Sequence, residues 1–120
     1  MKNKNSNLAY RTVISIKKFL ERNGYEILES AKEMNPCQII ALTEDKNTIV
    51  FVHTDWLLAC EDFSTVETPN RCEFERQAIK WLRSNNEYMD IAVRFDCVTC
   101  NILTADKALI RHQINVLLKD

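Results

Sequence analysis

The stretch CQIIALTEDKNTIVFVHTD, residues 37–55, decides the fold. Two apolar runs, 38–43 and 48–54, flank the tetrad Glu44-Asp45-Lys46-Asn47, which contains no apolar side chain. Short apolar runs around such a turn predict a β-hairpin, and the β-branched residues of the second run favour a strand. The hairpin ends in His53-Thr54-Asp55, so this strand end is the first candidate position for chemistry.

Elements on the two sides of the hairpin follow from similar patterns. Residues 8–23 have one apolar helical face and precede Gly24, which predicts a helix that stops at this glycine. Residues 25–29 alternate between polar and apolar side chains and predict a strand. Thr68-Pro69 predicts the N-cap and first helical position of a second helix that runs to about Asn85.

The C-terminal part adds two more strands. Residues 91–103 and 108–112 predict strands around a turn at 104–107, and residues 113–118 predict a short helical end. The expected order is α-β-β-β-α-β-β, a mixed sheet flanked by helices in the α/β (α+β) class. We expect a flexible N-terminus over residues 1–7 and a single domain over residues 8–120.

Composition restricts the class of protein more than its function. Hydrophobic residues make up 46% of the 120 residues and charged residues 28%, as in soluble globular proteins. The net charge of −1 lacks the basic character of many nucleic-acid binders but leaves room for a local basic face. No apolar run approaches the roughly 20 residues that span a bilayer, and the first residues lack a signal-peptide pattern. We therefore expect a cytoplasmic protein with no membrane partner.

The five cysteines are expected to be free thiols in a reducing compartment. Cys97-Val98-Thr99-Cys100 has the spacing of a redox or zinc motif, but it lies in a predicted strand. Side chains at an odd separation on a strand point to opposite faces, so Cys97 and Cys100 cannot form a disulfide or chelate together without a bulge. Both are predicted to be small buried hydrophobic side chains.

Three motifs surround the hairpin along the chain: FLERNGYEIL at 19–28, VRFDCV at 93–98 and LIRHQINVL at 109–117. In this order and spacing they resemble the YraN-type family, small bacterial proteins with a fold like that of restriction endonucleases and Holliday-junction resolvases. The resemblance runs from about residue 8 to the C-terminus. It implies a restriction-endonuclease-like mixed β-sheet that, in an intact member, carries a metal-dependent D…E-x-K centre.

The residues that this family uses at its centre are replaced here. The family has Gly-Glu-Ile-Asp-Leu-Ile on the first hairpin strand, Phe-Val-Glu-Val-Lys on the second, and a glutamate on the first helix. By this resemblance the degenerate positions are Val13, Gln38, Ile40, His53 and Asp55. The resemblance therefore implies no catalytic residue, and we expect no metal and no other cofactor.

The replacements remove the groups that metal-assisted phosphate hydrolysis needs. Mg²⁺ prefers oxygen ligands, of which Ile40 offers none, and His53 offers a nitrogen that suits Zn²⁺ better. Asp55 reverses the charge of the family's lysine and would repel a phosphate. A metal site rebuilt from His53, Asp55 and Gln38 is disfavoured because a third strong ligand is missing.

Cations on both predicted helices offer a way to bind nucleic acid without cutting it. Each helix has one such stripe: Arg11, Lys18 and Arg22 on the first, and Arg76, Lys80 and Arg83 on the second. The alternative is an ordinary solvated helix face, which the nearby acids Glu21, Glu73 and Glu75 favour for each stripe taken alone.

Two segments have structural interpretations. Arg94 and Asp96 are expected to share one strand face and to pair with other groups in the site region, while Phe95 faces a helix on the other side. The apolar run Trp56-Leu57-Leu58 either packs into the core, which is the default, or forms an exposed patch. An exposed patch would make an isologous homodimer the first expectation.

The leading hypothesis is a catalytically inactive YraN-type domain that binds DNA or RNA, or engages a protein partner. The alternative is an active endonuclease that holds Mg²⁺ or Mn²⁺ through relocated ligands, for which Glu44, Asp62 or Asp96 would have to be recruited. A third class is a purely structural interaction protein.

Overall fold

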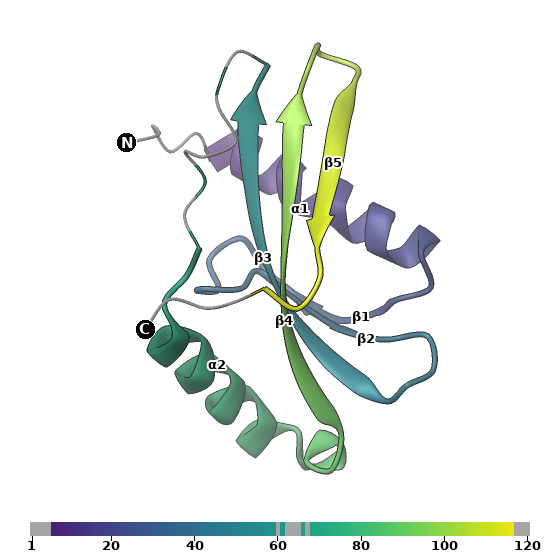
Figure 1. The fold of residues 1–120 in the computed structure, drawn as a ribbon, viewed down its shortest axis with the longest axis vertical. Helices are drawn as coiled ribbons and strands as arrows, with labels where there is room; N and C mark the ends of the chain where they lie inside the picture. Colours follow the sequence, from purple (N-terminus) through teal and green to yellow (C-terminus); the bar gives the residue numbers. More distant parts are fainter. Residues whose placement is uncertain (1–5, 60, 62–65, 67, 117–120) are drawn as a thin grey trace.

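The computed structural model describes residues 6–59, 61, 66 and 68–116 of the chain (Figure 1). The helical elements are α1 (Ser6–Arg22), α2 (Arg71–Ser84) and the short 3-10 helix η2 (Asn86–Tyr88). The strands are β1 (Glu26–Ser30), β2 (Ile39–Leu42), β3 (Thr48–Leu58), β4 (Ala92–Ile102) and β5 (Ala108–Gln113). The predicted mixed α+β class and the order α-β-β-β-α-β-β are confirmed.

The strands form one five-stranded sheet in the order β1-β2-β3-β4-β5. Neighbours pair antiparallel except β3 and β4, which run parallel from the pair Thr48–Ala92 to the pair Leu58–Ile102. A parallel pair needs a crossover connection, and the segment that contains α2 supplies it. No helix among the described residues is long and apolar enough to cross a membrane.

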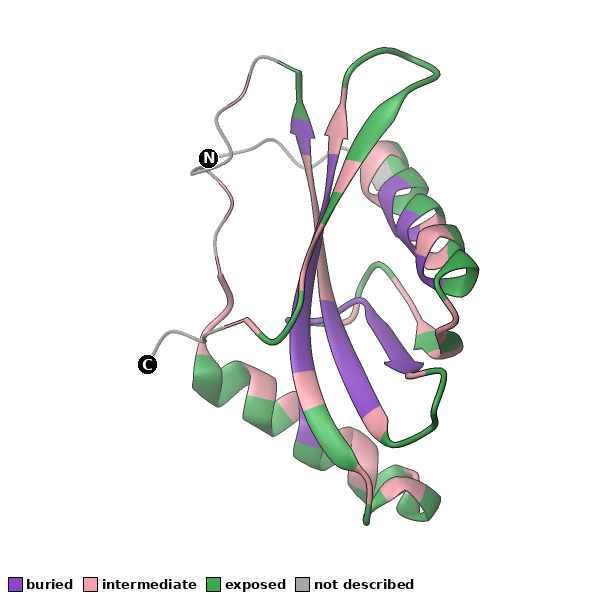
Figure 2. Cartoon of the chain, turned by 45° about the vertical axis from the view of Figure 1, so that its right-hand side comes forward, coloured by how far each residue is buried: buried purple, intermediate pink, exposed green. Residues whose placement is uncertain are grey.

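The two helices cover opposite faces of the sheet (Figure 2). Ile16 and Leu20 of α1 are buried in one core with Val52 of β3. Ala78 of α2 is buried in a second core with Phe51, the neighbour of Val52 on the same strand. Side chains alternate along a strand, so the continuous apolar run of β3 supplies both cores, one residue to each in turn.

Gly24 ends α1, as the sequence predicts. Its φ of +90° lies in the left-handed region that glycine adopts without steric cost. The Gly24 N–H donates to the Glu21 carbonyl over 3.1 Å, and the Tyr25 N–H donates to the Leu20 carbonyl over 3.0 Å. These two bonds form a Schellman motif, which turns the chain from α1 into β1.

The predicted N-cap of α2 at Thr68 is wrong. The helix begins after Asn70, whose side-chain oxygen accepts hydrogen bonds from the N–H groups of Cys72 and Glu73 over 2.8 and 3.3 Å. Asparagine caps a helix at least as well as threonine, and here it stands directly before the first helical residue.

Two strand ends also differ from the prediction. Strand β3 continues beyond residue 54 to Leu58, because its parallel pairing with β4 continues to the same length. Strand β5 includes Gln113, and residues 114–116 are not helical, with Asn115 at a φ of 57°. The remainder of the predicted helical end, residues 117–118, lies outside the described residues.

Asp96 of β4 is a fully buried carboxylate that accepts four hydrogen bonds. Arg94 donates two of them, from Nε and Nη2 over 2.9 Å each. His112 Nε2 lies 2.8 Å from Oδ2, and the Asn115 N–H donates to Oδ1 over 2.9 Å. Arg94 also donates to the hydroxyl of Tyr25 over 2.9 Å. Arg94 and Asp96 therefore share a face as predicted, and they connect β4 to β5 and to the start of the β1 segment.

Hydrogen bonding sets the charge state of this carboxylate. Burial raises the pKa of Asp96, but the hydrogen bonds from His112, Arg94 and the Asn115 amide outweigh it, so the pKa lies below its ordinary value. The ionised form then stabilises the fold above about pH 4, the ordinary pKa of aspartate. This contribution is lost as the pH falls through the lower pKa of the folded state.

We expect Asp96→Asn to lower the free energy of unfolding at neutral pH by about 2–4 kcal/mol, because it leaves the guanidinium of Arg94 without its carboxylate. Urea unfolding at pH 7 and at about pH 3 measures this. The difference between variant and wild type should shrink at the acidic pH, because there the unfolded wild type binds a proton at Asp96 more readily than the folded protein does. The exposed Asp106→Asn is the control, and equal losses in the two variants at pH 7 would contradict the assignment.

Candidate functional site

Among the positions that the resemblance assigns to a nuclease centre, Val13 lies apart from the other four. Ile40 is fully buried in the core beneath α2, where it is paired with Phe51 across the β2–β3 hairpin. His53 and Asp55 follow Phe51 on the same face of β3. Val13 is buried in the core beneath α1, on the opposite side of the sheet. The sheet would therefore separate an acidic side chain at residue 13 from the other positions.

The polar side chains at these positions hold a loop in place. Gln38 Nε2 donates to the carbonyls of Met34 and Pro36 over 2.9 and 3.1 Å. Gln38 Oε1 accepts from the N–H and the hydroxyl of Thr54 over 2.8 and 2.9 Å. His53 Nδ1 also contacts the Pro36 carbonyl. The hydrogen bonds of Gln38 and His53 therefore hold residues 34–36 against β3, and we call these bonds the brace.

The carboxylates that an alternative metal site would need are placed separately. Asp55 Oδ1 accepts from the N–H of Trp56 over 2.7 Å, and Asp96 is held by its four donors on the other face of the sheet. Glu44 is exposed in the turn between β2 and β3, and Asp62 lies outside the described residues. Within the described residues, no group of three or more His, Cys, Asp or Glu side chains could hold a metal ion.

The C-x-x-C segment has the strand geometry that the sequence predicts. Cys97 is buried in the core beneath α2, and Cys100 is buried in the core beneath α1. Both are free, and burial raises the pKa of Cys97 to about 12 and that of Cys100 to about 11. Such thiols are poor nucleophiles at neutral pH, which agrees with a packing role. Cys60 lies outside the described residues.

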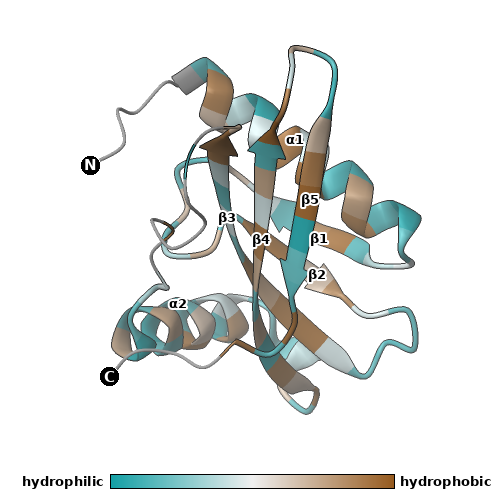
Figure 3. Cartoon of the chain, turned by 45° about the horizontal axis from the view of Figure 1, so that its top comes forward, coloured by the Kyte–Doolittle hydropathy of each residue, from teal (hydrophilic) through white to brown (hydrophobic). Residues whose placement is uncertain are grey.

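The stripe on α1 forms one wall of a groove. The groove has a volume of about 440 Å³ and lies between α1 and the β4–β5 hairpin. Figure 3 shows α1 with alternating hydrophilic and hydrophobic segments and the hairpin beside it. Arg11, Lys18 and Arg22, all exposed, line this groove, and Lys107 of the β4–β5 turn lines it from the other side. The three predicted residues are thus brought together with a fourth cation.

This groove has an excess of positive charge. Among the described residues that line it, Asp106 is the only carboxylate, against four cations. Apolar and small side chains such as Ile102, Ile110 and Ser15 form the rest of the lining. Glu21, which favoured an ordinary solvated face, lines a different depression on the other flank of α1. Glu21 therefore does not offset the positive charge of Arg11, Lys18 and Arg22 within the groove.

Sequence reasoning missed Lys107. The residue lies in a predicted turn with no basic pattern around it, and its neighbour in sequence is Asp106. Only the pairing of β4 with β5 carries this turn to the side of α1. The signal that could have found it is the turn itself, since loop residues on a rigid hairpin often contribute to binding.

The three cations of the α2 stripe do not share one surface. Arg76 and Lys80 line a cavity beneath α2, whereas Arg83 is exposed and does not line it. Glu29 and Glu73 line the same cavity, so its charged groups are balanced in number. This arrangement lacks the one-signed surface that a nucleic-acid backbone requires.

The segment Trp56-Leu57-Leu58 does not form one exposed patch. Leu57 is fully buried, and Trp56 is half-buried against the core beneath α1. Leu58 is 45% exposed. The homodimer expected from an exposed patch stays a prediction. Leu57 packs into the core, as the default expectation has it, and the three side chains do not gather on one surface. The reason is that β3 extends through these residues instead of ending before them.

Neither the scan against protein-family models nor the search of curated proteins finds a match for this chain. The resemblance to YraN-type proteins therefore stays a prediction from the motifs.

We expect Gln38→Ala to destabilise the protein by about 2–4 kcal/mol, because it removes four hydrogen bonds and leaves buried backbone groups unpaired. Thermal unfolding followed by circular dichroism measures the loss. The matched control is Gln113→Ala at the end of the edge strand β5, which should cost less than about 1 kcal/mol. A loss at Gln38 no larger than that at Gln113 would show that the brace is unimportant.

Proposed function

We propose that this chain is a non-catalytic nucleic-acid-binding domain on a nuclease-like fold. The observation that supports this proposal is the groove between α1 and the β4–β5 hairpin, whose described lining residues include four cations and a single carboxylate. Phosphate contacts from arginine and lysine supply most of the affinity of sequence-independent nucleic-acid binding.

The positions of the cations support a contact with several phosphates. Arg11, Lys18 and Arg22 extend along three turns of α1, which corresponds to a distance of about 16 Å along the helix axis. Their side chains are exposed, so they can reach a strand that lies along the groove. Lys107 approaches from the hairpin side and would contact the same strand from across the groove.

The loss of catalysis is supported by the degenerate positions. Ile40 provides an apolar, fully buried side chain where the family places a metal-binding carboxylate. Gln38 and His53 are occupied by hydrogen bonds to the 34–36 loop and to Thr54. A domain of this kind holds nucleic acid, DNA or RNA, without hydrolysing it.

We expect binding of labelled DNA or RNA whose affinity falls steeply between about 50 and 200 mM salt. Replacing Arg11, Lys18 and Arg22 by Gln should make the slope of log K against log salt shallower by about 2–3, since each phosphate contact contributes about 0.7–0.9. Fluorescence anisotropy with single strands and duplexes of both nucleic acids measures the slope.

The control carries the same change in charge on the other helix. Replacing Arg76, Lys80 and Arg83 by Gln should leave the salt slope unchanged, because these residues lie outside the groove. Equal slopes in the two triple variants, or no binding by the wild type at low salt, would refute the proposed interface. Gel analysis after incubation with Mg²⁺ or Mn²⁺ should show intact nucleic acid, and cleavage would revive the endonuclease alternative.

A further inference from the structure

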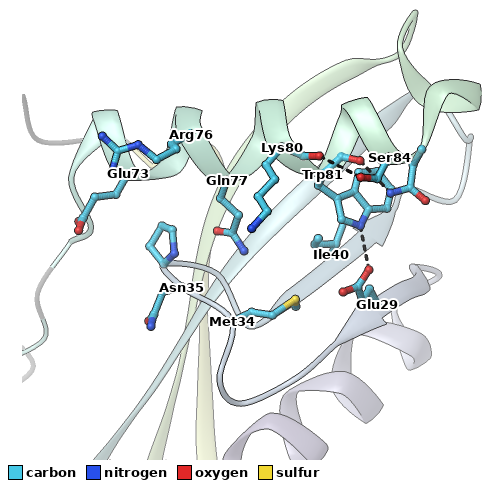
Figure 4. A pocket seen from close by; sticks show the side chains of 12 residues that line it. Glu29, Met34, Asn35, Ile40, Glu73, Arg76, Gln77, Lys80, Trp81 and Ser84 are labelled. Carbon is cyan, nitrogen blue, oxygen red and sulfur yellow. Dashed lines mark hydrogen bonds between the residues drawn. The ribbon is translucent and has the colours of Figure 1, made fainter.

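A second concave site lies beneath α2. Its volume is about 630 Å³, and its walls are α2 on one side and β1 with the 34–36 loop on the other (Figure 4). Pockets that bind small molecules in proteins range from about 300 to 1,000 Å³. The cavity is on the opposite face of the sheet from the α1 groove, so a ligand here would be independent of nucleic acid bound there.

The walls of this cavity are tied together by side chains. The Gln77 amide of α2 accepts from the Cys37 N–H over 2.9 Å and donates to the Cys37 carbonyl over 2.8 Å. Trp81 Nε1 of α2 donates to the Glu29 carboxylate of β1 over 3.0 Å. Together with the brace from Gln38 and His53, these bonds fix the loop and the helix at a set distance. The cavity is therefore preformed, which reduces the entropy cost of binding.

One part of the lining is apolar and rigid. The Trp81 ring stacks on Tyr88 with centroids 5.5 Å apart and meets Phe51 edge-on at 6.0 Å. Met34 and Ile40 also line the cavity. A fixed indole beside flexible and branched apolar groups suits a flat ring, because it provides contact area with little loss of side-chain freedom.

The charged part of the lining has a lysine between two glutamates. Figure 4 shows the Lys80 side chain extending from α2 into the cavity, between Glu73 at one end and Glu29 at the other. No hydrogen bond or ion pair joins the Lys80 ammonium to another described residue. Glu29 is committed to the Trp81 indole, and Glu73 lies beside Arg76 in the same view. Of the two described cations that line the cavity, Lys80 is therefore the one whose unpaired ammonium extends toward its interior.

We propose that the cavity binds a small planar ligand that carries one anionic group. The ring lies against Trp81 and Met34, and the anion is held by Lys80. Two classes of compound share this chemistry, a mononucleotide and an aromatic carboxylate. Ile40, which is fully buried, lies behind this apolar part of the lining.

The test follows the indole N–H resonance of Trp81 in nitrogen-15 spectra, assigned with the Trp56→Phe variant. The probes are adenosine monophosphate, adenosine, benzoate and inorganic phosphate, each titrated to the millimolar range. A saturable shift with adenosine monophosphate alone supports the nucleotide class, and one with benzoate supports the carboxylate class. No saturable shift with either, or binding of inorganic phosphate as tight as that of both, overturns the proposal.

Variants on α2 separate a binding role from a structural one. Lys80→Gln should weaken binding of the effective probe by about tenfold or more, as expected for loss of a hydrogen bond to a charged group. Lys80→Arg should retain most of the affinity. Arg83→Gln makes the same charge change on the same helix outside the cavity and should have no effect. Equal effects of Lys80→Gln and Arg83→Gln would refute the assignment of Lys80.

The outcome is also separable from the proposed nucleic-acid interface. The variant that replaces Arg11, Lys18 and Arg22 keeps the whole cavity, so it should bind the small probe with wild-type affinity. Loss of probe binding in that variant would contradict an independent site.

Discussion

The buried carboxylate of Asp96 is the constraint that holds β4, β5 and the residues after β5 together on the face of the sheet that α1 covers. A charge in the protein interior is tolerated only when donors replace the water it has lost, and Asp96 meets this demand with four hydrogen bonds. His112, one of its partners, also contacts the rings of Phe19 of α1 and Tyr25 at centroid distances of 6.0 and 5.9 Å. Since His112 belongs to β5, the same group that satisfies Asp96 also packs β5 against α1, on the face of the sheet where the groove lies.

The other face of the sheet depends on neutral hydrogen bonds. Three side chains hold the backbone of residues 34–37: Gln38 from the start of β2, His53 from β3 and Gln77 from α2. Gln38 also bonds to Thr54 of β3. In the family pattern, residues 38 and 53 carry acidic side chains. An amide and an imidazole there can each donate to a carbonyl, which a carboxylate cannot do. The side chains present at these two positions therefore fix the loop, and the cavity beneath α2 takes its shape from that loop.

Local patterns were sufficient for much of this fold. The turn residues 44–47 and the apolar runs on either side specified the β2–β3 hairpin, and Gly24 specified the end of α1. Strand alternation placed Cys97 and Cys100 on opposite faces. The errors at Thr68 and beyond residue 54 arose where two local signals competed or where pairing with a distant strand extended an element.

The candidate sites depended more on contacts between distant segments. The α1 stripe could be read from helical spacing, but neither Lys107 nor the division of the α2 stripe could, since both follow from how the elements pack. Alignment with the family suggested that Val13 and Ile40 belong to one site. The sheet lies between them, and no pattern within either segment indicates this.

The overall charge of −1 does not show which carboxylates are paired within the fold. Asp96 is neutralised inside the sheet, Glu29 accepts from the Trp81 indole, and Glu26 forms an ion pair with Lys46 at 3.0 Å. Carboxylates held in this way contribute little field at the α1 groove, particularly at physiological salt, where the screening length is about 8 Å. The groove can therefore be positive while the chain as a whole is nearly neutral, because the sign of a binding surface depends on where each charge is paired and not on the sum.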